Sequence, residues 1–423
     1  MHPNALFDQA TELLREVLKL DHPADSIVSA FFRQNRELGT RERHALAETT
    51  YTVLRQRLLF QHLAQSGSGP LERRLVILAW QGTENFLART LNPQEQVWLA
   101  AVQKIDRATL PEKLRHNLPD WLATPLREAL GAGPDGGFWP LVKAISEQAP
   151  LDLRVNTFKA KRDDVRAALA AAGIQAEPTP HSPWGLRVQG KPALHKLDVF
   201  TRGDVEVQDE GSQLLALLTD AKRGEMVVDF CAGAGGKTLA LGASMRNTGR
   251  LYAFDTSGHR LDALKPRLAR SGLSNVHPAQ IAHERDDRIK RLAGKIDRVL
   301  IDAPCSGLGT LRRNPDLKWR QSPKSVQELQ AKQAAILASA SRLLKPGGRL
   351  VYATCSLLTA ENEAVAEAFT AEREADFAPL PAQTALEVAH VERAVELTSG
   401  PYLRLWPHIH GTDGFFAAVW ERR

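Results

Sequence analysis

The sequence predicts an α/β protein whose C-terminal half forms a parallel, doubly wound sheet. From about residue 211 onward, short β-type runs alternate with helical segments, a pattern typical of parallel sheets covered by helices. The first 130 residues carry helical periodicity and few glycines or prolines, which indicates a separate all-helical region. A mixed stretch between the two predicts a small α+β domain. We therefore expect three domains, at residues 1–140, 141–210 and 211–423.

The N-terminal helices are predicted from the spacing of apolar residues. Between Leu6 and Leu20, apolar side chains step by four, three, four and three residues, which places them on one face of a helix. Ala45–Leu59 and Leu71–Trp80 continue in the same style. Four glycines and one proline then gather in Gly131–Gly137, and this composition predicts a loop or linker.

The later elements are predicted from short runs bounded by turn residues. A helix is expected over Lys161–Ala172, ending at Gly173, and a turn is expected at Lys345–Gly348. The expected strands are Leu151–Val155, Gly185–Val188, Met226–Val228, Leu251–Phe254, Arg298–Ile301, Arg349–Ala353 and Phe415–Trp420.

Composition excludes several classes of protein. The chain has 423 residues and three cysteines, and no two of these cysteines lie two residues apart, which excludes a disulfide framework and a zinc ribbon. No apolar run approaches the ~18 residues that a membrane helix needs, and the N-terminus lacks the basic-then-apolar order of a signal peptide. We expect a reduced, cytoplasmic protein with no metal and no membrane anchor, and the sequence does not predict an oligomeric state.

Charge is distributed unevenly along a chain whose net charge is +6. Residues 1–150 carry 17 basic and 17 acidic groups, whereas residues 251–350 carry 19 basic and 9 acidic groups. Residues 351–423 carry 5 basic and 11 acidic groups. A local basic excess can attract a polyanion. On charge alone, a solvated basic surface without a partner is an equally open alternative.

A glycine-rich loop, Asp229–Thr238, joins a predicted strand to a predicted helix. A phosphate-binding P-loop would need a glycine where Cys231 stands, and a dinucleotide fingerprint would need one where Thr238 stands. Asp255 ends the next strand, 22 residues after Gly233, where a carboxylate can accept hydrogen bonds from ribose hydroxyls. These features fit a nucleoside cofactor without a pyrophosphate, such as S-adenosylmethionine. The alternative is a glycine turn needed only for packing, with Asp255 as a surface cap.

Two cysteines follow predicted buried strands. Cys305 lies in Asp302–Gly307 and Cys355 lies in Ala353–Ser356. Because ligands of open parallel sheets bind outside the carboxyl ends of the strands, we expect both thiols to face the same crevice as the glycine loop. A single free cysteine is more often a small buried hydrophobic residue, but two at equivalent strand ends favour chemistry. Cys231 lies in the glycine loop itself, where packing or a backbone contact is expected.

Several short motifs together point to one family. They are Cys231–Thr238, Asp302–Gly307, Arg312–Trp319, Thr354–Ser356, Gln208–Ser212, Gly411–Phe416 and Leu38–Arg43. Most of them resemble motifs of the RNA cytosine-5 methyltransferases of the Sun (Fmu-like) family, whose Rossmann-like, S-adenosylmethionine-dependent catalytic domain follows a small RRM-like subdomain. The last segment resembles the helical domain shared with the antitermination factor NusB. This arrangement is similar to that of bacterial enzymes that methylate small-subunit ribosomal RNA.

The resemblance implies a role for each candidate residue. Cys355 would be the nucleophile that adds to carbon 6 of cytosine, which makes carbon 5 nucleophilic towards a methyl group. Cys305 would assist the later release of the base. Lys237 would line the crevice and help to lower the pKa of a neighbouring thiol. The residues expected to bind the cofactor are Cys231, Ala232, Gly233, Ala234, Gly235, Gly236, Lys237, Asp255, Gln280 and Asp302.

The resemblance implies specific contacts for Asp302 and Gln280. Asp302 would lie between the methionine moiety and the target base, where it could hydrogen-bond the ring. Gln280 stands where the family usually has an acid near the adenine, and its side-chain carbonyl could accept from the adenine amino group. Asp286 and Asp287 lie further on and are alternatives for that contact.

The expected substrate is RNA, with ribosomal RNA as the first expectation and transfer RNA as the alternative. The target base must leave any helical stack to reach a thiol in a crevice, which favours a loop or unfolded RNA. Basic residues that follow Cys305 would hold phosphates near the crevice. They are Arg312, Arg313 and Lys318, together with Arg320.

Three rival functions follow from the same sequence. The first is a non-catalytic RNA-binding protein with a remnant methyltransferase fold, which would need neither Cys305 nor Cys355. The second is a small-molecule methyltransferase, which would need neither the basic segment nor the extra N-terminal domains. The third is a cytosine methyltransferase in which Cys305 attacks, as a Pro-Cys dipeptide does in DNA enzymes, and Cys355 is idle.

Overall fold

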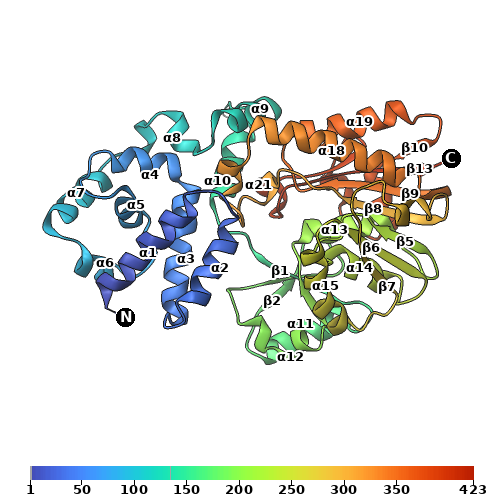
Figure 1. The fold of residues 1–423 in the computed structure, drawn as a ribbon, viewed down its shortest axis with the longest axis horizontal. Helices are drawn as coiled ribbons and strands as arrows, with labels where there is room; N and C mark the ends of the chain where they lie inside the picture. The colour runs from blue at the N-terminus through green and yellow to red at the C-terminus, as the bar shows by residue number, and fades with distance from the viewer. Residues whose placement is uncertain (1, 134) are drawn as a thin grey trace. The chain divides into compact units, whose positions relative to one another are not determined.

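A computed structural model describes residues 2–133 and 135–423 of the chain (Figure 1). Met1, the first residue of the sequence, and Pro134, in the predicted linker, lie outside the described residues. The described residues of Gly131–Gly137 form a loop between two helices, as their composition predicts.

The described chain divides into two compact units. The unit named here the helical unit is formed by Met1–Gln148, as far as it is described, together with Thr310–Pro323. The second, named here the α/β unit, is formed by Ala149–Gly309 and Lys324–Arg423. The predicted linker therefore lies inside the helical unit, and the chain leaves the α/β unit once before it returns.

The helical unit is built from α-helices of two to four turns, with shorter pieces between them. Its helices are α1 (Pro3–Val17), α2 (Ala24–Gln34), α3 (Thr40–Arg55), α4 (Arg57–Ala64), α5 (Leu71–Ala79), α6 (Glu84–Thr90), α7 (Pro93–Gln103), α8 (Glu112–His116), α9 (Asp120–Leu130), α10 (Phe138–Ser146) and α17 (Leu317–Arg320).

The apolar stripe of α1 explains how this unit is packed. Proline at the first helical position fits the helix start, where no backbone donor is needed, and Leu6, Leu13 and Val17 are buried in the core as predicted. Leu20, by contrast, lies beyond the helix with a φ of 60°. The helix predicted over Ala45–Leu59 is divided at Gln56, between α3 and α4.

Thr310–Pro323 packs inside the helical unit, although its neighbours in the sequence belong to the α/β unit. The indole Nε1 of Trp319 donates to the carbonyl of Leu54 at 2.7 Å. The Lys318 Nζ donates to the carbonyl of Arg55 at 2.8 Å. These two carbonyls belong to the last turn of α3, whose final carbonyl groups have no partner within the helix.

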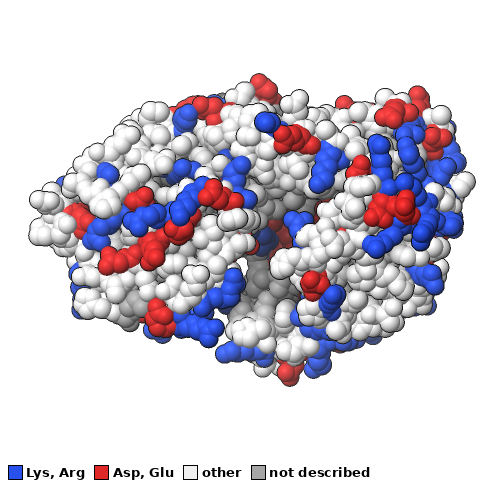
Figure 2. Space-filling view, viewed as in Figure 1, with Lys and Arg blue, Asp and Glu red and all other residues white. Residues whose placement is uncertain are grey.

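Charged side chains of both signs lie interspersed on the helical unit in the view of Figure 2. This mixture agrees with the equal numbers of basic and acidic groups in residues 1–150. None of the helices formed by the described residues is both long and apolar enough to cross a membrane.

The α/β unit begins with a small antiparallel sheet in the order β2-β3-β1-β4. Val165 and Leu169 of its long helix share a buried cluster with Leu153 and Leu186 of the strands. The elements are β1 (Leu151–Val155), α11 (Arg162–Ala171), β2 (Ala176–Pro178), β3 (Gly185–Val188), α12 (Asp198–Thr201) and β4 (Val205–Val207).

A larger sheet follows, in the order β11-β12-β13-β9-β8-β5-β6-β7, with β10 paired to β13. Its strands are β5 (Met226–Asp229), β6 (Arg250–Asp255), β7 (Val276–Gln280), β8 (Ile296–Asp302), β9 (Leu344–Thr354), β10 (Phe377–Leu380), β11 (Thr398–Ser399), β12 (Tyr402–Leu405) and β13 (Phe415–Arg422). The helices between them are α13 (Glu210–Thr219), α14 (Gly236–Ser244), α15 (Gly258–Ser271), α16 (Asp287–Lys290), α18 (Pro323–Ser341), α19 (Glu363–Glu372), α20 (Ala382–Val388) and α21 (Pro407–His410).

The large sheet is parallel over part of its width. Strands β5 to β9 pair in parallel, as the alternation of strands and helices predicts. The expectation of a wholly parallel sheet is wrong at the other edge, where β13 runs antiparallel to β9, β10 and β12. The physical reason is that β12 and β13 are joined by a short connection, which suits antiparallel neighbours, whereas parallel neighbours need a long crossover.

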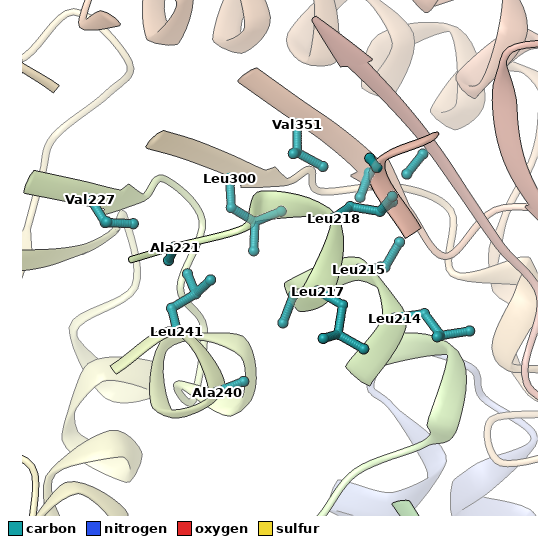
Figure 3. Close-up of a cluster of buried hydrophobic side chains, with 14 of the residues drawn as sticks. Leu214, Leu215, Leu217, Leu218, Ala221, Val227, Ala240, Leu241, Leu300 and Val351 are labelled. Atoms are coloured by element: carbon teal, nitrogen blue, oxygen red, sulfur yellow. The ribbon is translucent and has the colours of Figure 1, made fainter. Parts of the chain in front are cut away.

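Helices cover both faces of this sheet because alternate side chains point to opposite faces. Val227, Leu300 and Val351 face a cluster that includes the leucines of α13 (Figure 3). Val228 and Ile301 point the other way, into a cluster with side chains of α18 and α19. Burial on both faces explains why these strands are continuous apolar runs rather than alternating ones.

The chain order creates a crevice at one end of the sheet. From β5 the chain continues outward through β6 and β7 on one side, and then crosses to β8 and β9 on the other. Ligands of open α/β sheets bind outside the carboxyl ends of the strands at such a switch point. Those ends carry the glycine loop and both predicted cysteines.

Candidate active site

A cavity of about 730 Å³ lies at the carboxyl ends of the parallel strands. Its size suits a small-molecule ligand. The strand-end segments that line it are Asp229–Ala234 and Gly236–Lys237 after β5, Asp255–Ser257 after β6, Ile281–Glu284 after β7, Asp302–Cys305 after β8, and Cys355 after β9.

The glycine loop is fixed to the next strand by Asp255. The backbone N–H of Gly233 donates to Asp255 Oδ2 at 2.8 Å, and the N–H of Ser257 donates to Oδ1 at 2.7 Å. Gly233 has a φ of +55°, and a Cβ built on it would meet nothing within 4 Å. The loop therefore leaves open space above its backbone, and Asp255 is bound to the loop rather than acting as a surface cap. Each carboxylate oxygen keeps a lone pair for a further donor.

Gly235 does not line the cavity, although it is among the residues predicted to bind the cofactor. It has a φ of +81°, and a Cβ there would lie 2.1 Å from the Leu264 Cδ1. The residue does not line the cavity, unlike its neighbours on both sides. Glycine is required at this position because α15 packs against the loop and the backbone is left-handed, not because a ligand approaches it.

Two arginines that are not among the residues predicted from the sequence bind backbone carbonyls of the loop. Arg154, on β1, is buried and donates from Nη1 to the carbonyl of Gly236 at 2.5 Å. Arg267, on α15, donates from Nη1 to the carbonyl of Ala234 at 2.6 Å. The small sheet is thus tied directly to the glycine loop. The sequence gives no signal for this contact, because the alternation in β1 only places Arg154 on the polar face of the strand.

Asp229, in the cavity wall, forms a buried polar pair with Thr238. The Thr238 hydroxyl donates to Asp229 Oδ2 at 2.7 Å. Burial raises the pKa of Asp229 to about 7, although this hydrogen bond opposes the shift. A carboxyl group with such a pKa is partly protonated near neutral pH.

The two predicted cysteines are brought together by the ends of β8 and β9. The Sγ atoms of Cys305 and Cys355 lie 3.4 Å apart, and both residues line the cavity. The hydrogen bond with Cys355, reinforced by burial, raises the pKa of Cys305 well above its ordinary value. Cys305 therefore keeps its proton, which it can donate to the sulfur of Cys355.

Lys237 and Asp302 form an ion pair in the same wall of the cavity. The Nζ and Oδ2 atoms are 2.6 Å apart. Burial disfavours the charged form of Lys237, but the neighbouring carboxylate outweighs it and raises the pKa of the ammonium. The cation predicted beside the thiols is therefore present and is charged at neutral pH.

Cys231 is separate from the thiol pair. It lines the cavity within the glycine loop, and burial raises the pKa of its thiol well above the ordinary value. A thiol that keeps its proton is a poor nucleophile, in agreement with the packing role expected from the sequence.

Gln280, expected at the adenine, is exposed and does not line the cavity. Its Nε2 donates to the carbonyl of Thr256 at 3.0 Å. Asp286 is also outside the cavity, where it accepts from the N–H groups of Ala282 and Arg288. The wall at this end is formed instead by the residues that directly follow Gln280, which are Ile281, Ala282, His283 and Glu284.

The structure also places the predicted phosphate-binding residues differently. Arg312 and Lys318 are buried in the helical unit, with exposed fractions of 7% and 5%. Burial lowers the pKa of Lys318 to about 7, and the nearby Arg55 adds to this effect. Two of the four predicted phosphate contacts are therefore buried side chains of the helical unit, and the other two, Arg313 and Arg320, are half-buried.

Two family models match the chain. The family model described as 16S rRNA methyltransferase RsmB/F matches residues 216–421. A second family model, the ferredoxin-like domain of RsmF/B-like methyltransferases, matches residues 118–195. Together the two matches include nearly all of the large sheet, most of the residues that line its cavity and most of the small sheet.

Curated relatives carry the same description. The chain is 36% identical over 305 residues to a probable ribosomal RNA small subunit methyltransferase B of Synechocystis sp., covering 72% of this chain and 66% of the relative. It is 35% identical over 272 residues to the corresponding Bacillus subtilis protein, covering 64% of this chain and 59% of the relative. The chain thus spans about three fifths to two thirds of these relatives' own length.

Solved structures are similar to all or to three quarters of the chain. The crystal structure titled PH0851 is 26% identical, with a TM-score of 0.78, over 100% of this chain and 99% of that one. A methyltransferase homolog protein from Pyrococcus horikoshii is 28% identical, with a TM-score of 0.63, over 75% of this chain and 100% of that one.

Proposed function

Because the chain belongs to the RsmB/F family of 16S rRNA methyltransferases, we propose that it transfers a methyl group from S-adenosylmethionine to carbon 5 of a cytosine in small-subunit ribosomal RNA. The observation that carries this proposal is the pair of thiols, 3.4 Å apart, in the wall of the large cavity. Methyl transfer to an oxygen or nitrogen needs no covalent activation of the acceptor, whereas carbon 5 of cytosine is a poor nucleophile until a group adds to carbon 6.

The residues around the glycine loop fit the cofactor. S-adenosylmethionine supplies an electrophilic methyl group when it is bound. Asp255 would accept hydrogen bonds from the ribose hydroxyls through the lone pairs that Gly233 and Ser257 leave free. The open space above Gly233 lets a ligand approach the backbone closely. Asp302 would lie between the methionine moiety and the base.

The thiol chemistry would run in two stages. The Cys355 thiolate forms a bond to carbon 6 of the target cytosine, and the electron pair of the carbon 5–carbon 6 double bond becomes available at carbon 5. After carbon 5 has gained the methyl group, a base removes its proton. The electron pair of that C–H bond restores the double bond and expels the thiolate.

Cys305 suits the second stage. While Cys355 is free, their hydrogen bond helps to keep Cys305 protonated. When Cys355 becomes a thioether, it is a much weaker acceptor, and the largest cause of the raised pKa of Cys305 is removed. Cys305 therefore ionises more readily at the step at which a base is needed.

The remaining parts of the chain would handle the RNA. We assign the helical unit to positioning the substrate and residues 149–210 to the small subdomain that supports the glycine loop. The rest of the α/β unit is assigned to catalysis. The assignment of support rests on Arg154, which reaches from β1 to the loop. Arg313 and Arg320, which are half-buried, remain candidates for contact with RNA phosphates.

Product analysis tests this proposal. Unmodified 16S ribosomal RNA and small-subunit particles are incubated with the protein and S-adenosylmethionine, and the RNA is then digested to nucleosides for mass spectrometry. The expected product is 5-methylcytidine, absent with Cys355→Ala. A methyl group on another nucleoside, or 5-methylcytidine formed equally by Cys355→Ala, would contradict the proposal.

A further inference from the structure

Glu361 is a fully buried carboxylate that is outside the cavity yet beside both cysteine loops. It ends the short 3-10 helix Thr359–Glu361 that follows the Cys355 loop. Its Oε1 accepts from the backbone N–H of Ser306 at 2.8 Å and from Gln333 Nε2 at 3.0 Å. Its Oε2 accepts from the hydroxyls of Ser306 and Ser356, both at 2.5 Å.

Three of these four hydrogen bonds join two loops that are about fifty residues apart in the sequence, and the fourth, from Gln333, joins them to α18. Ser306 directly follows Cys305, and Ser356 directly follows Cys355. A single carboxylate therefore binds the residue after each thiol, and the two serine hydroxyls lie 3.2 Å from each other.

The residues next to Glu361 hold the same region. Its backbone carbonyl accepts from the Tyr352 hydroxyl at 2.6 Å, and the side chain of Asn362 donates to the carbonyl of Ser356 at 3.0 Å. Gln333 also donates to the carbonyl of Pro304, directly before Cys305, at 3.0 Å. The backbone on both sides of the thiol pair is thus connected to this one point.

We propose that Glu361 is a positioning residue that fixes the separation of the Cys305 and Cys355 thiols. A buried carboxylate is costly unless donors satisfy it, and here four donors do so at hydrogen-bonding distance. Charge-assisted bonds are shorter and stronger than neutral ones, so a carboxylate holds the loops more tightly than an amide would. The effect of Glu361 on catalysis rests on the proposed function, in which the two sulfurs must be close enough to share a proton.

The separation of the thiols can be measured without methyl transfer. With oxidised glutathione, both thiols lose their hydrogens, one sulfur–sulfur bond forms between Cys305 and Cys355, and the glutathione disulfide is reduced to two glutathione molecules. The equilibrium constant of this exchange reports how closely the protein holds the two sulfurs. Alkylation followed by peptide mass spectrometry distinguishes this bond from any that involve Cys231.

The experiment compares Glu361→Ala, Glu361→Gln and the matched control Glu367→Gln, which changes an exposed acid on α19. For Glu361→Ala, we expect the exchange constant to fall about tenfold or more, because four anchoring bonds are lost. For Glu361→Gln, we expect a smaller fall, because an amide of the same shape can still bind both loops. Glu367→Gln should match the unmodified protein.

The kcat values of these variants should fall in the same order as their exchange constants, whereas their affinity for S-adenosylmethionine should not change. In Glu361→Ala, kcat is expected to fall about tenfold, while the calorimetric Kd for S-adenosylmethionine stays unchanged because Glu361 does not line the cavity. A folded Glu361→Ala protein with the unmodified exchange constant would overturn the proposal. Failure of the proposed cytosine chemistry would instead leave the exchange result intact.

A second variant covers the case in which Glu361→Ala does not fold, as judged by circular dichroism. The double variant Ser306→Ala with Ser356→Ala keeps the carboxylate and its two N–H donors but removes both hydroxyl donors. We expect its exchange constant to fall in the same direction as that of Glu361→Ala. An unchanged constant in this variant would also overturn the proposal.

Discussion

Replacing Lys318 by methionine should stabilise the helical unit near neutral pH and not near pH 10. The Lys318 ammonium group is buried, its Nζ has one hydrogen bond, to the carbonyl of Arg55, and its pKa is lowered to about 7. Methionine keeps an unbranched apolar side chain of similar length but carries no charge. The same substitution tests whether Lys318 has a structural role or contacts RNA phosphates.

The magnitude follows from the two pKa values of Lys318, which are 10.5 ordinarily and about 7 in the folded protein. Between these values the unfolded chain binds a proton that the folded chain does not, so the stability of the unmodified protein falls as the pH falls from 10.5 to 7 and is level below that. At about 1.36 kcal/mol for each unit of pKa, the cost is about 5 kcal/mol at pH 6.5 and about 1 kcal/mol at pH 9.5. Losing the hydrogen bond to Arg55 costs about 1 kcal/mol at either pH. The expected net gain is about 4 kcal/mol at pH 6.5 and about zero at pH 9.5.

Urea denaturation followed by circular dichroism at both pH values measures this difference. Lys104→Met is the matched control, because Lys104 is exposed in the same unit. The control should show no such pH-dependent gain. A gain for Lys318→Met that is equal at pH 6.5 and pH 9.5, or a loss at both, would refute the reasoning. RNA affinity should be unchanged in Lys318→Met if the side chain is structural.

The remaining predictions concern the cofactor loop and the helical unit. Asp255→Ala removes the acceptor of the Gly233 N–H and of the expected ribose hydroxyls, so calorimetry should show S-adenosylmethionine affinity reduced about tenfold or more, and unchanged affinity would count against the assignment. Arg154→Met should weaken S-adenosylmethionine binding by a smaller factor, because Arg154 supports the loop but does not line the cavity. Equal losses of affinity in Asp255→Ala and Arg154→Met would indicate that both substitutions unfold the loop. A fragment of residues 141–423 should keep cofactor binding but lose affinity for structured RNA, and it should be less stable because Thr310–Pro323 loses the helices on which it packs. Methylation by the fragment as fast as by the full chain would show that the helical unit does not position RNA.

Features that depend on neighbouring residues in the sequence could be predicted. The strand β5, the turn at Gly233 and the helix α14 are encoded by an apolar run, glycines and a helical segment that follow one another. The meeting of Cys305 and Cys355 could also be predicted, because parallel strands bring their carboxyl ends to one edge of the sheet.

Features that depend on distant contacts could not be predicted. The sequence around Lys318 predicts a surface cation, but the structure buries the residue and pairs its Nζ with a carbonyl on α3. Arg154 is a polar residue in an alternating strand, and nothing near it in the sequence indicates its contact with Gly236, 82 residues further on. Gln280 stands at the expected strand end, but the cavity wall is formed by the residues just after it. In each case the direction of a side chain was set by packing that local pattern does not encode.

Trapping the covalent adduct tests the central claim most directly, since it asks which thiol bonds to the base. Cys305→Ala and Cys355→Ala are each incubated with target RNA and S-adenosylmethionine and analysed on a denaturing gel. The account predicts a slow protein–RNA band for Cys305→Ala, because attack and methyl transfer proceed but release is impaired, and no such band for Cys355→Ala. The reverse pattern would make Cys305 the nucleophile. Full methylation by both variants without any adduct would contradict covalent catalysis by this pair of thiols.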